Sequence, residues 1–566
     1  MRRGARIGVL FCSLLGMMLL VPLATNAQAY NAKPKLVVIF VIDQFRGDYL
    51  NRDHSKFHGR GFRLFTDEGT WFTDCYYDYA NTQTAPGHAT IGTGAYTDGH
   101  GIELNEWWDP ARSTVHKVTS VEDERYRIVN MTTPENSGKP EADQYAIGAS
   151  PRNLRASTLG DELRLATQGR ARVFGISLKD RAAILTSGQT ANGAFWIDSA
   201  NGEFVTSTYY MQHLPDWARA FNASGRIVQA KREAGAVGTT RFYEDVGQTP
   251  AANRYELDFA KALITGEKLG QNEVTDMLTV SLSANDIQGH QFGPDSDSEE
   301  KMIEGLDRDL DSFLTWLDKT VSLDNVWLAL TADHGVAPIP SESAKLGIHS
   351  GVLDMLALRE ELNTQLNDRF SPHAKIDYFM PEPDLPYLVL NRRAFEKQNI
   401  DEKTAEDTVA ALLPEAVSAQ NRQQTELAPQ ALRTKPDVRL LGAYTRIALA
   451  NGDVPPTQLG RELAHSYANH GTWFVMLVLD GYQMGNLDSK THTIHFSPWS
   501  YDRHVPLAFY GTPFIRGEYH ERVAPVDLAS TFASLLGINW PSAAVGRVLT
   551  EAFKPAHIDE QVAKHP

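Results

Sequence analysis

Four apolar runs in this 566-residue chain each end in side chains that can bind metal ions or anions. The runs span residues 37–43, 173–179, 277–286 and 326–334. They are rich in β-branched and aliphatic residues, as is typical of parallel strands that are covered on both faces. In open α/β sheets, ligands bind beyond the carboxyl ends of such strands. The sequence therefore predicts an α/β fold with a mostly parallel central sheet, helices on both faces and a site at one sheet edge.

The residue types at the ends of the runs indicate what such a site could bind. They are Asp43, Lys179, Arg181, Asp286, His290, Asp333 and His334. Each has a structural explanation when taken alone, since an aspartate can end a strand in a turn and a Lys/Arg pair can form a solvated turn. Packing does not explain why they recur at successive strand ends, so we interpret them as one functional site.

Aspartates combined with histidines indicate zinc, because ligand sets made only of oxygen atoms favour magnesium or calcium. Three aspartates and three histidines would hold two Zn²⁺ ions. The third histidine must come from late in the chain, and His495 is the first choice and His504 the second. Two metal ions about 4 Å apart can clamp the attacking and leaving oxygens of an in-line displacement.

Thr84 is the candidate nucleophile. It is followed by Pro86, and this pattern predicts a helix start with the threonine near the N-cap and the proline in the first turn. A metal ion can lower the pKa of a threonine hydroxyl, and a helix N-terminus stabilises a developing alkoxide and a phosphate. The alternative, common for a threonine in this position, is that Thr84 only caps the helix.

Residues 1–29 have the pattern of a secretory signal peptide. Arg2, Arg3 and Arg6 precede the apolar stretch Ile7–Val21, and the small-residue site Ala27–Ala29 follows it. An N-terminal membrane anchor is the alternative. We expect a periplasmic or secreted protein with no membrane segment after cleavage.

Composition restricts the partners and the means of stabilisation. The formal net charge is −16 and becomes more negative when the signal peptide is lost, which argues against binding to a nucleic-acid backbone. Small anionic substrates could still bind at a local cationic site. Only Cys75 remains once Cys12 is removed, so we expect no internal disulfide.

The middle of the chain lacks the strand-end pattern and is interpreted as an inserted α+β cap region over residues 341–484. Within it, Glu402–Leu413 is predicted to be a helix that Pro414 ends, with linker-like sequence over 421–435. The segment FVMLVLDGY then returns to extended structure. Residues 30–340 and 485–555 form the predicted catalytic domain.

Six segments resemble motifs of the alkaline phosphatase superfamily, specifically its phosphate-irrepressible bacterial alkaline phosphatases. VIDQFRGDYL resembles the first metal-ligand strand, NTQTAPGHATIGTG the T-x-P-G-H nucleophile motif, and HGIELNEWWD the H-G-I…N-x-W-x-D stretch. ISLKDRAAIL resembles the lysine-x-arginine motif, SANDIQGHQFGP the D-x-x-G-H-x-x-G-P motif, and TADHG the aspartate–histidine pair. The resemblance spans nearly the whole mature chain and implies an alkaline-phosphatase-like core.

The resemblance also implies a role for each candidate residue. One zinc would be held by Asp286, His290 and His495, and the other by Asp43, Asp333 and His334 with Thr84 bridging toward it. The phosphoryl oxygens would be gripped by Asn105, Lys179 and Arg181.

One departure from the family pattern concerns the last histidine, where the family usually has His-Gly and this chain has His495-Phe496. This departure leaves His504 open as the ligand. The spacing of His495 to Pro506 is similar to that in related phosphodiesterases and favours His495.

These observations predict a zinc-dependent alkaline phosphatase that hydrolyses small phosphate monoesters through a phosphothreonine intermediate. A nucleotide pyrophosphatase or phosphodiesterase of the same superfamily is the alternative, although such enzymes are not expected to carry Lys179 and Arg181. A sulfatase is disfavoured because no C-x-P-x-R or S-x-P-x-R motif occurs. A non-catalytic metal-binding or phosphate-binding protein is the third possibility. The leaving group and the oligomeric state stay open.

Overall fold

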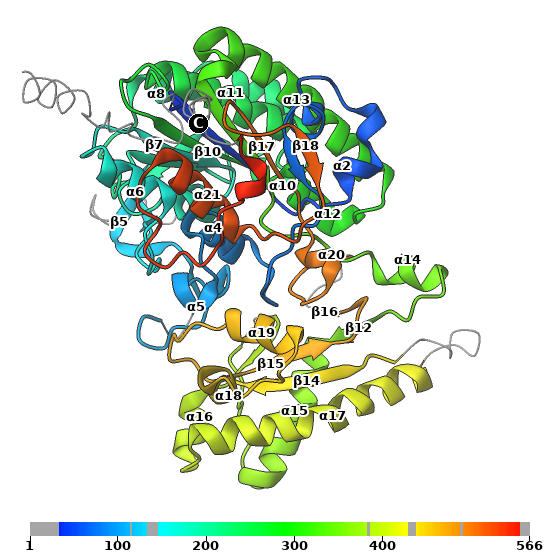
Figure 1. Ribbon diagram of the computed structural model, residues 1–566. Coiled ribbons are helices and arrows are strands. Elements are labelled where there is room, and N and C mark those ends of the chain that lie inside the picture. The colour runs from blue at the N-terminus through cyan, green and yellow to red at the C-terminus, as the bar shows by residue number, and fades with distance from the viewer. Residues whose placement is uncertain are drawn as a thin grey trace, which may run out of the picture. The chain divides into compact units, whose positions relative to one another are not determined.

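The computed structural model describes residues 33–113, 116–132, 145–381, 385–427, 437–486 and 491–554 (Figure 1). Residues 34–554 form one unit by their contacts. The predicted signal peptide lies outside the described residues, as does residue 555 at the predicted end of the catalytic domain. None of the helices in the described ranges has the length and apolar character needed to cross a bilayer.

The centre of the main sheet consists of five parallel strands. They are, in spatial order, β11 (Val326–Thr331), β1 (Leu36–Ile42), β10 (Asp276–Leu282), β7 (Val173–Ser177) and β8 (Gly193–Ile197). Every residue of these strands is buried, which explains why their sequences are apolar along their whole length. The four predicted runs are therefore confirmed as parallel strands.

The outer strands make the sheet mixed rather than parallel throughout. They are β17 (Leu507–Tyr510), β2 (Thr70–Phe72) and β18 (Gly517–Tyr519) beyond β11, and β9 (Phe204–Ser207), β5 (Glu122–Thr132) and β6 (Tyr145–Ala149) beyond β8. All but the β18–β2 pair are antiparallel pairings. The mostly parallel sheet of the prediction thus corresponds to the central five strands.

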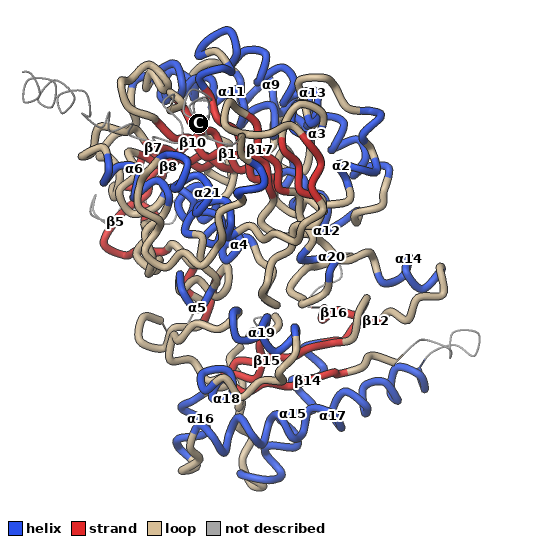
Figure 2. The backbone as a smooth tube through the Cα atoms, in the orientation of Figure 1, coloured by secondary structure: helices blue, strands red, loops and turns tan. Residues whose placement is uncertain are grey.

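Helices cover both faces of this sheet (Figure 2). One layer contains α4 (Thr84–Thr93), α6 (Leu159–Ala166), α7 (Asp180–Ser187) and α21 (Val526–Leu536), and the other contains α11 (Pro250–Gly266), α12 (Ala284–Phe292) and α13 (Asp297–Val321). The predicted amphipathic helix near the C-terminus is α21, and it stops at Gly537, which has φ 63°. Both faces of the parallel strands are therefore shielded from water.

Short helices connect these layers to the outer strands. They are α2 (Tyr49–Arg52), α3 (Phe62–Thr66), α5 (Thr97–His100), α8 (Asp216–Asn222), α9 (Arg226–Glu233), α10 (Phe242–Asp245) and α20 (Ser500–Arg503). A two-stranded hairpin, β3 (Glu106–Trp107) with β4 (Val118–Thr119), lies in the segment after α5.

Residues 341–484 carry further small sheets. The three-stranded sheet has the order β13 (Tyr387–Val389), β15 (Phe474–Leu479) and β14 (Leu440–Thr445), and the pair is β12 (Gly351–Asp354) with β16 (Gln483–Asn486). The helices of this region are α15 (Met355–Phe370), α16 (Arg392–Lys397), α17 (Glu402–Leu427), α18 (Arg446–Asn451) and α19 (Gln458–His465), preceded by α14 (Pro340–Lys345). Helices α15 and α17 share an apolar core with β15, which is the predicted return to extended structure.

The prediction that Pro414 ends its helix is wrong, because α17 continues through the proline to Leu427. A proline inside a helix removes one backbone hydrogen bond and costs about 3 kcal/mol. Val409 and Leu413 before it and Ala416 and Val417 after it are all buried in the same apolar core. Burial of both halves of α17 outweighs the cost of the proline. Because the helix continues to Leu427, part of the predicted linker over 421–435 is helical as well.

The Asp161 carboxylate holds the C-terminal end of α7, the helix that carries Arg181 and has Lys179 as its N-cap. Its oxygens accept hydrogen bonds from the backbone nitrogens of Thr158 (2.9 Å), Gln189 (3.1 Å) and Thr190 (2.6 Å). The start of α6 is thereby tied to the loop that follows α7. The N-terminus of α7, with Lys179 as its N-cap, is held at the carboxyl end of β7.

Candidate active site

The first candidate metal-ligand group lies on α12 and on the loop before α20. Strand β10 ends at Leu282, so Asp286 and His290 are helical residues rather than strand-end residues. Residues four positions apart lie on one face of a helix, and His290 Nε2 is 3.3 Å from Asp286 Oδ1. His495 Nε2 is 3.7 Å from the same oxygen. These three residues can converge on one ion.

The second candidate group follows the neighbouring strands β1 and β11. Asp43 comes directly after β1, and Asp333 and His334 follow β11. His334 Nε2 is 3.5 Å from Asp43 Oδ1 and 3.6 Å from Asp333 Oδ2, and all three side chains are fully buried. The His334 ring stacks on His495 with ring centres 3.7 Å apart. The two groups are therefore contiguous.

All three histidines present the same ring nitrogen to the carboxylates. The Nδ1 atoms of His290, His334 and His495 lie 2.9, 2.9 and 2.5 Å from the carbonyl oxygens of Thr493, Gly335 and Thr82. Each Nδ1 must therefore carry a proton and donate it, which leaves an acceptor lone pair on Nε2 of the neutral ring. Backbone contacts of this kind orient metal-binding histidines.

The acceptor atoms facing one another fit a cation. Asp43 Oδ1 and His334 Nε2 are buried and have no hydrogen-bond partner among the described residues. Burial lowers the pKa of His334, and it lowers the pKa of His495 to about 3, so both rings are neutral. A carboxylate oxygen that faces an imidazole lone pair is repelled unless positive charge lies between them. The donor set thus matches the ligands that zinc prefers.

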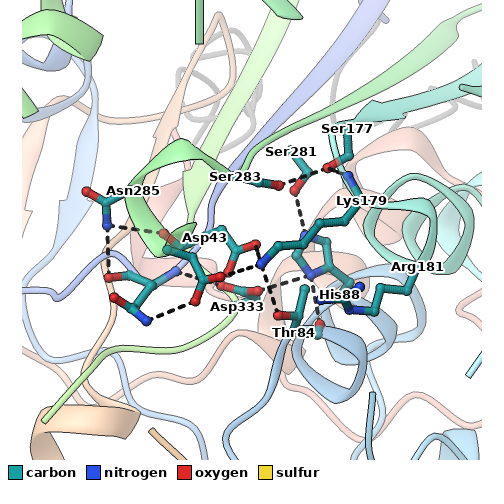
Figure 3. Close-up of polar contacts among 12 residues, drawn as sticks. Asp43, Thr84, His88, Ser177, Lys179, Arg181, Ser281, Ser283, Asn285 and Asp333 are labelled. Carbon is teal, nitrogen blue, oxygen red and sulfur yellow. Dashed lines mark hydrogen bonds and ion pairs between the residues drawn. The ribbon is translucent and has the colours of Figure 1, made fainter. Parts of the chain in front are cut away.

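Lys179 brings a positive charge to a carboxylate of each group, and Figure 3 shows its ammonium beside Asp43 and Thr84. Its Nζ donates to Asp43 Oδ2 at 2.6 Å, to Asp286 Oδ2 at 2.5 Å and to Thr84 Oγ1 at 3.5 Å. Burial opposes the charge of the ammonium group, but the two carboxylates outweigh it and raise the pKa of Lys179. Burial likewise opposes ionisation of Asp286, yet Lys179 and His290 hold its pKa well below the ordinary value.

Thr84 is the first residue of α4 and follows the N-cap residue Gln83, so the predicted helix start, with Thr84 near the N-cap and Pro86 in the first turn, is confirmed. Asn105 lies beside this helix end, because its Oδ1 accepts a hydrogen bond from Ala85 N at 2.8 Å. Its backbone nitrogen donates to Gln83 Oε1 at 2.9 Å. Asn105 and Arg181 line one cavity of about 420 Å³. The threonine hydroxyl thus lies at a helix N-terminus, which favours negative charge.

Two residues in the site had no predicted role. His88 lies one helical turn after Thr84, with its Nδ1 2.8 Å from Thr84 O and 3.2 Å from Asp333 Oδ2, and its Nε2 2.7 Å from Ser281 Oγ. Gln44 donates its backbone N–H to Asp333 Oδ1 at 3.1 Å and its side-chain amide to Asp286 Oδ1 at 2.9 Å. The four-residue spacing to Thr84 could have revealed His88.

No sequence signal points to Gln44, because its role depends on an unusual backbone conformation. It has φ 61°, which is uncommon for a residue other than glycine. That conformation lets its backbone and side chain bind carboxylates that come from two different elements.

His504 lies away from both groups. Its Nε2 is 2.8 Å from Thr73 O, and its ring stacks on Tyr76 with ring centres 4.6 Å apart. Among the described residues that can converge on an ion, the late histidine is His495. The structure therefore places His495, the first choice, with the other predicted ligands and leaves His504, the second choice, away from them.

The central strands of the main sheet are parallel, two Asp/His groups lie at their carboxyl edge, and a threonine lies at a helix N-terminus. These features define the class: this is a protein of the alkaline phosphatase superfamily. The chain belongs to the type I phosphodiesterase / nucleotide pyrophosphatase family, whose sequence pattern it matches over residues 37–445.

Several relatives match along nearly their whole length. The chain is 31% identical to the alkaline phosphatase PhoV of Synechococcus elongatus, over 97% of this chain and 98% of that protein. It is 32% identical to the alkaline phosphatase PafA of Elizabethkingia meningoseptica, over 93% and 96% of the two chains. A crystal structure of wild-type PafA superposes with a TM-score of 0.78 at 30% identity, covering 92% of this chain and 99% of that chain.

We predict that His495→Ala lowers the amount of tightly bound divalent metal, because its Nε2 lies with Asp286 and His290. Loss of a ligand should weaken metal affinity by more than the roughly 10- to 100-fold seen when only a supporting residue is lost. His504→Ala is the matched control, since the ring of this histidine lies against Thr73 and Tyr76, away from both metal-ligand groups. Metal analysis after dialysis measures both variants. A larger loss of metal from His504→Ala would contradict the assignment.

Proposed function

We propose that the protein is a secreted or periplasmic two-zinc alkaline phosphatase that hydrolyses phosphate monoesters to an alcohol and inorganic phosphate. One observation carries the proposal: the Lys179 ammonium lies within 3.5 Å of Thr84 and of a carboxylate from each metal-ligand group. The names of the relatives, alkaline phosphatases PhoV and PafA, support the same activity.

The proposed metal ligands are the two groups described above. Asp286, His290 and His495 would hold one Zn²⁺. Asp43, Asp333 and His334 would hold the other, with Thr84 bridging toward it, and Asp286 also lies within reach of Asp43 and His334. When bound, the two ions supply Lewis acidity to the attacking and leaving oxygens. The buried acceptors Asp43 Oδ1 and His334 Nε2 support this set, because an ion would satisfy both.

The residues of the chain bind and turn over the phosphoryl group in two steps. Thr84 Oγ gives up its proton to solvent as it attacks phosphorus, the bond from phosphorus to the alcohol oxygen breaks, and the departing alkoxide takes a proton from water. Water then attacks phosphorus and loses a proton to solvent, the bond from phosphorus to Thr84 Oγ breaks, and Thr84 Oγ regains a proton as inorganic phosphate is released. The N-terminus of α4 stabilises negative charge in both steps, and Asn105, Lys179 and Arg181 orient the phosphoryl oxygens.

The two cations set the preference for monoesters over diesters. A monoester presents one more unsubstituted, charged oxygen than a diester and can accept additional charge-assisted hydrogen bonds. Lys179 is buried at the site, and Arg181 lines the adjoining cavity with Asn105. A nucleotide pyrophosphatase or phosphodiesterase activity is the second candidate, favoured by the family pattern over residues 37–445.

The domain assignment belongs to the same proposal. Residues 1–29 serve as a signal peptide, residues 30–340 and 485–555 form the catalytic domain, and residues 341–484 form a cap. Gln83 Nε2 donates to Leu385 O at 3.0 Å, and this contact between the N-cap of α4 and the insertion supports a cap over the site. Small phosphate monoesters are the proposed partners, without binding of a nucleic-acid backbone or of a membrane by the mature chain.

We predict that the purified protein contains about two zinc ions per chain, because two contiguous Asp/His groups are present. Chelation should remove the activity and added zinc should restore it. Elemental analysis combined with phosphate release measures both. Magnesium as the sole metal, or full activity after exhaustive chelation, would contradict the two-zinc proposal.

Thr84→Ala is expected to lose nearly all turnover, because the hydroxyl is the proposed nucleophile. It should keep the fold and the metal content, because the Asp and His side chains that hold each ion remain and the hydroxyl only bridges toward one of them. Thr84→Ser is the matched control and should retain substantial activity, since it keeps the oxygen. Rapid quench with a labelled monoester should show phosphate on Thr84 in the wild type. Wild-type rates in Thr84→Ala would rule out the covalent mechanism.

Arg181→Ala and Lys179→Ala should lower monoester hydrolysis far more than diester hydrolysis. Each contact contributes about 2–4 kcal/mol in a preorganised site, which is about 30- to 1000-fold in rate. Asn105→Ala should show a weaker bias, because a neutral donor contributes less than a cation. The measurement is the ratio of kcat/KM for a monoester and a diester of the same chromogenic alcohol.

Arg181→Ala is the cleaner of the two variants, because Lys179 also binds the carboxylates of Asp43 and Asp286. Metal content is therefore measured for Lys179→Ala in parallel. Arg170→Ala, an exposed arginine before the start of β7, controls for the loss of a positive charge. An unchanged ratio in Arg181→Ala would favour the phosphodiesterase alternative.

A further inference from the structure

Phe496 holds a backbone conformation that bulky residues rarely adopt. Its φ is 92°, in the region that favours glycine, and a residue other than glycine persists there only where its surroundings impose it. Thr82 imposes it here, because its Oγ accepts hydrogen bonds from Phe496 N at 3.1 Å and from Ser497 N at 3.2 Å. Backbone strain of this kind concentrates at functional sites, so it points to a functional role for the Phe496 ring.

The Phe496 side chain forms a wall next to the proposed phosphoryl site. It is partly exposed and lines the cavity of about 420 Å³ together with Asn105, Arg181 and Leu385. Its ring meets His495 edge to face, with ring centres 4.3 Å apart and an interplanar angle of 72°. Asn105 is bonded to the first turn of α4, so this cavity adjoins Thr84. A substrate whose phosphorus faces Thr84 can extend its leaving group into the cavity.

The charges that line the cavity are paired. Lys117 lies 3.3 Å from Glu106 across the β3–β4 hairpin, and Arg181 lies 3.8 Å from Asp180. Beyond Arg181, which is assigned to the phosphoryl group, the wall carries no unpaired charge among these residues. It consists of the apolar side chains Leu104, Leu385 and Phe496 and the uncharged polar side chains Gln83, Asn105 and Thr119. Such a lining suits a neutral planar group better than a further phosphate or carboxylate.

We propose that Phe496 is a specificity-determining residue whose ring packs against an aromatic ring in the leaving group of the phosphate monoester. Nucleoside phosphates and aryl phosphates share this chemistry. The proposal rests on the monoesterase function proposed above and adds the substrate class. It also gives the strained phenylalanine a function, since glycine would fit the backbone but would leave the wall of the cavity without a ring.

The test compares substrates that differ only in an aromatic group. Adenosine 5′-monophosphate and ribose 5-phosphate have the same primary-alcohol leaving oxygen, so the ratio of their kcat/KM values isolates binding of the base. Phe496→Gly should lower this ratio by about 5- to 30-fold, at the lower end of the effect of removing a stacking partner because the ring is partly exposed. Phe496→Tyr keeps the ring and should keep the ratio.

A second arm distinguishes the two sources of the ring. The ratio for phenyl phosphate and glycerol 3-phosphate is measured in the wild type and in Phe496→Gly, and dividing the two ratios cancels the intrinsic reactivity of phenol. A fall for both substrate pairs supports a general aromatic subsite, and a fall for the nucleotide pair alone supports a nucleobase subsite. Unchanged ratios in both arms would overturn the proposal.

A thermal-unfolding measurement and a Phe496→Leu variant distinguish loss of the aromatic subsite from a general loss of stability. Phe496→Gly should unfold thermally close to the wild-type temperature, because relief of the backbone strain offsets the lost packing of a partly exposed ring and the greater freedom of the unfolded chain. Phe496→Leu keeps an apolar side chain and the strain but lacks the ring, so its ratio should fall as well. A wild-type ratio in Phe496→Leu would overturn the role of the ring. If the metal-loaded wild type releases phosphate from no monoester, the monoesterase proposal itself fails.

Discussion

Three buried carboxylates at one edge of the sheet create a demand for positive charge on which the rest of the site depends. Asp43, Asp286 and Asp333 come from three different elements and lie in one buried cluster. Burial of uncompensated carboxylates is costly, so cations must lie among them. The Lys179 ammonium supplies one, and the imidazoles of His290, His334 and His495 that face the carboxylates provide the remaining ligands that a metal ion needs.

The fold supplies the precision that this charge balance requires. Parallel neighbours β11, β1, β10 and β7 end at the same edge, so residues far apart in the chain meet within hydrogen-bonding distance. The N-terminus of α4 adds partial positive charge beside Thr84. The proposed aromatic subsite also depends on hydrogen bonds from a neighbouring residue, since Thr82 holds both the His495 ring and the strained backbone of Phe496.

Much of this architecture could be predicted because parallel strands leave a distinct record in the sequence. A strand covered on both faces must be apolar throughout, so the four runs and the polar residues that follow them can be recognised from residue types alone. Local signals were less dependable where packing opposes them. Pro414 should end a helix by its own chemistry, but the buried residues on either side of it hold α17 together. Distant contacts outweighed a local preference at that position.

The sequence by itself determined the α/β class, the central strands and the candidate residues at their ends, because periodicity and residue type are local properties. The sequence ranked His495 before His504 by its spacing to Pro506, and the tertiary structure decided between them, since the two histidines occur close together in the chain and differ in what lies opposite them. Only the tertiary structure indicated roles for Gln44 and Phe496. Their importance arises from left-handed backbone conformations that surrounding hydrogen bonds impose, and no residue pattern in the chain encodes such a conformation.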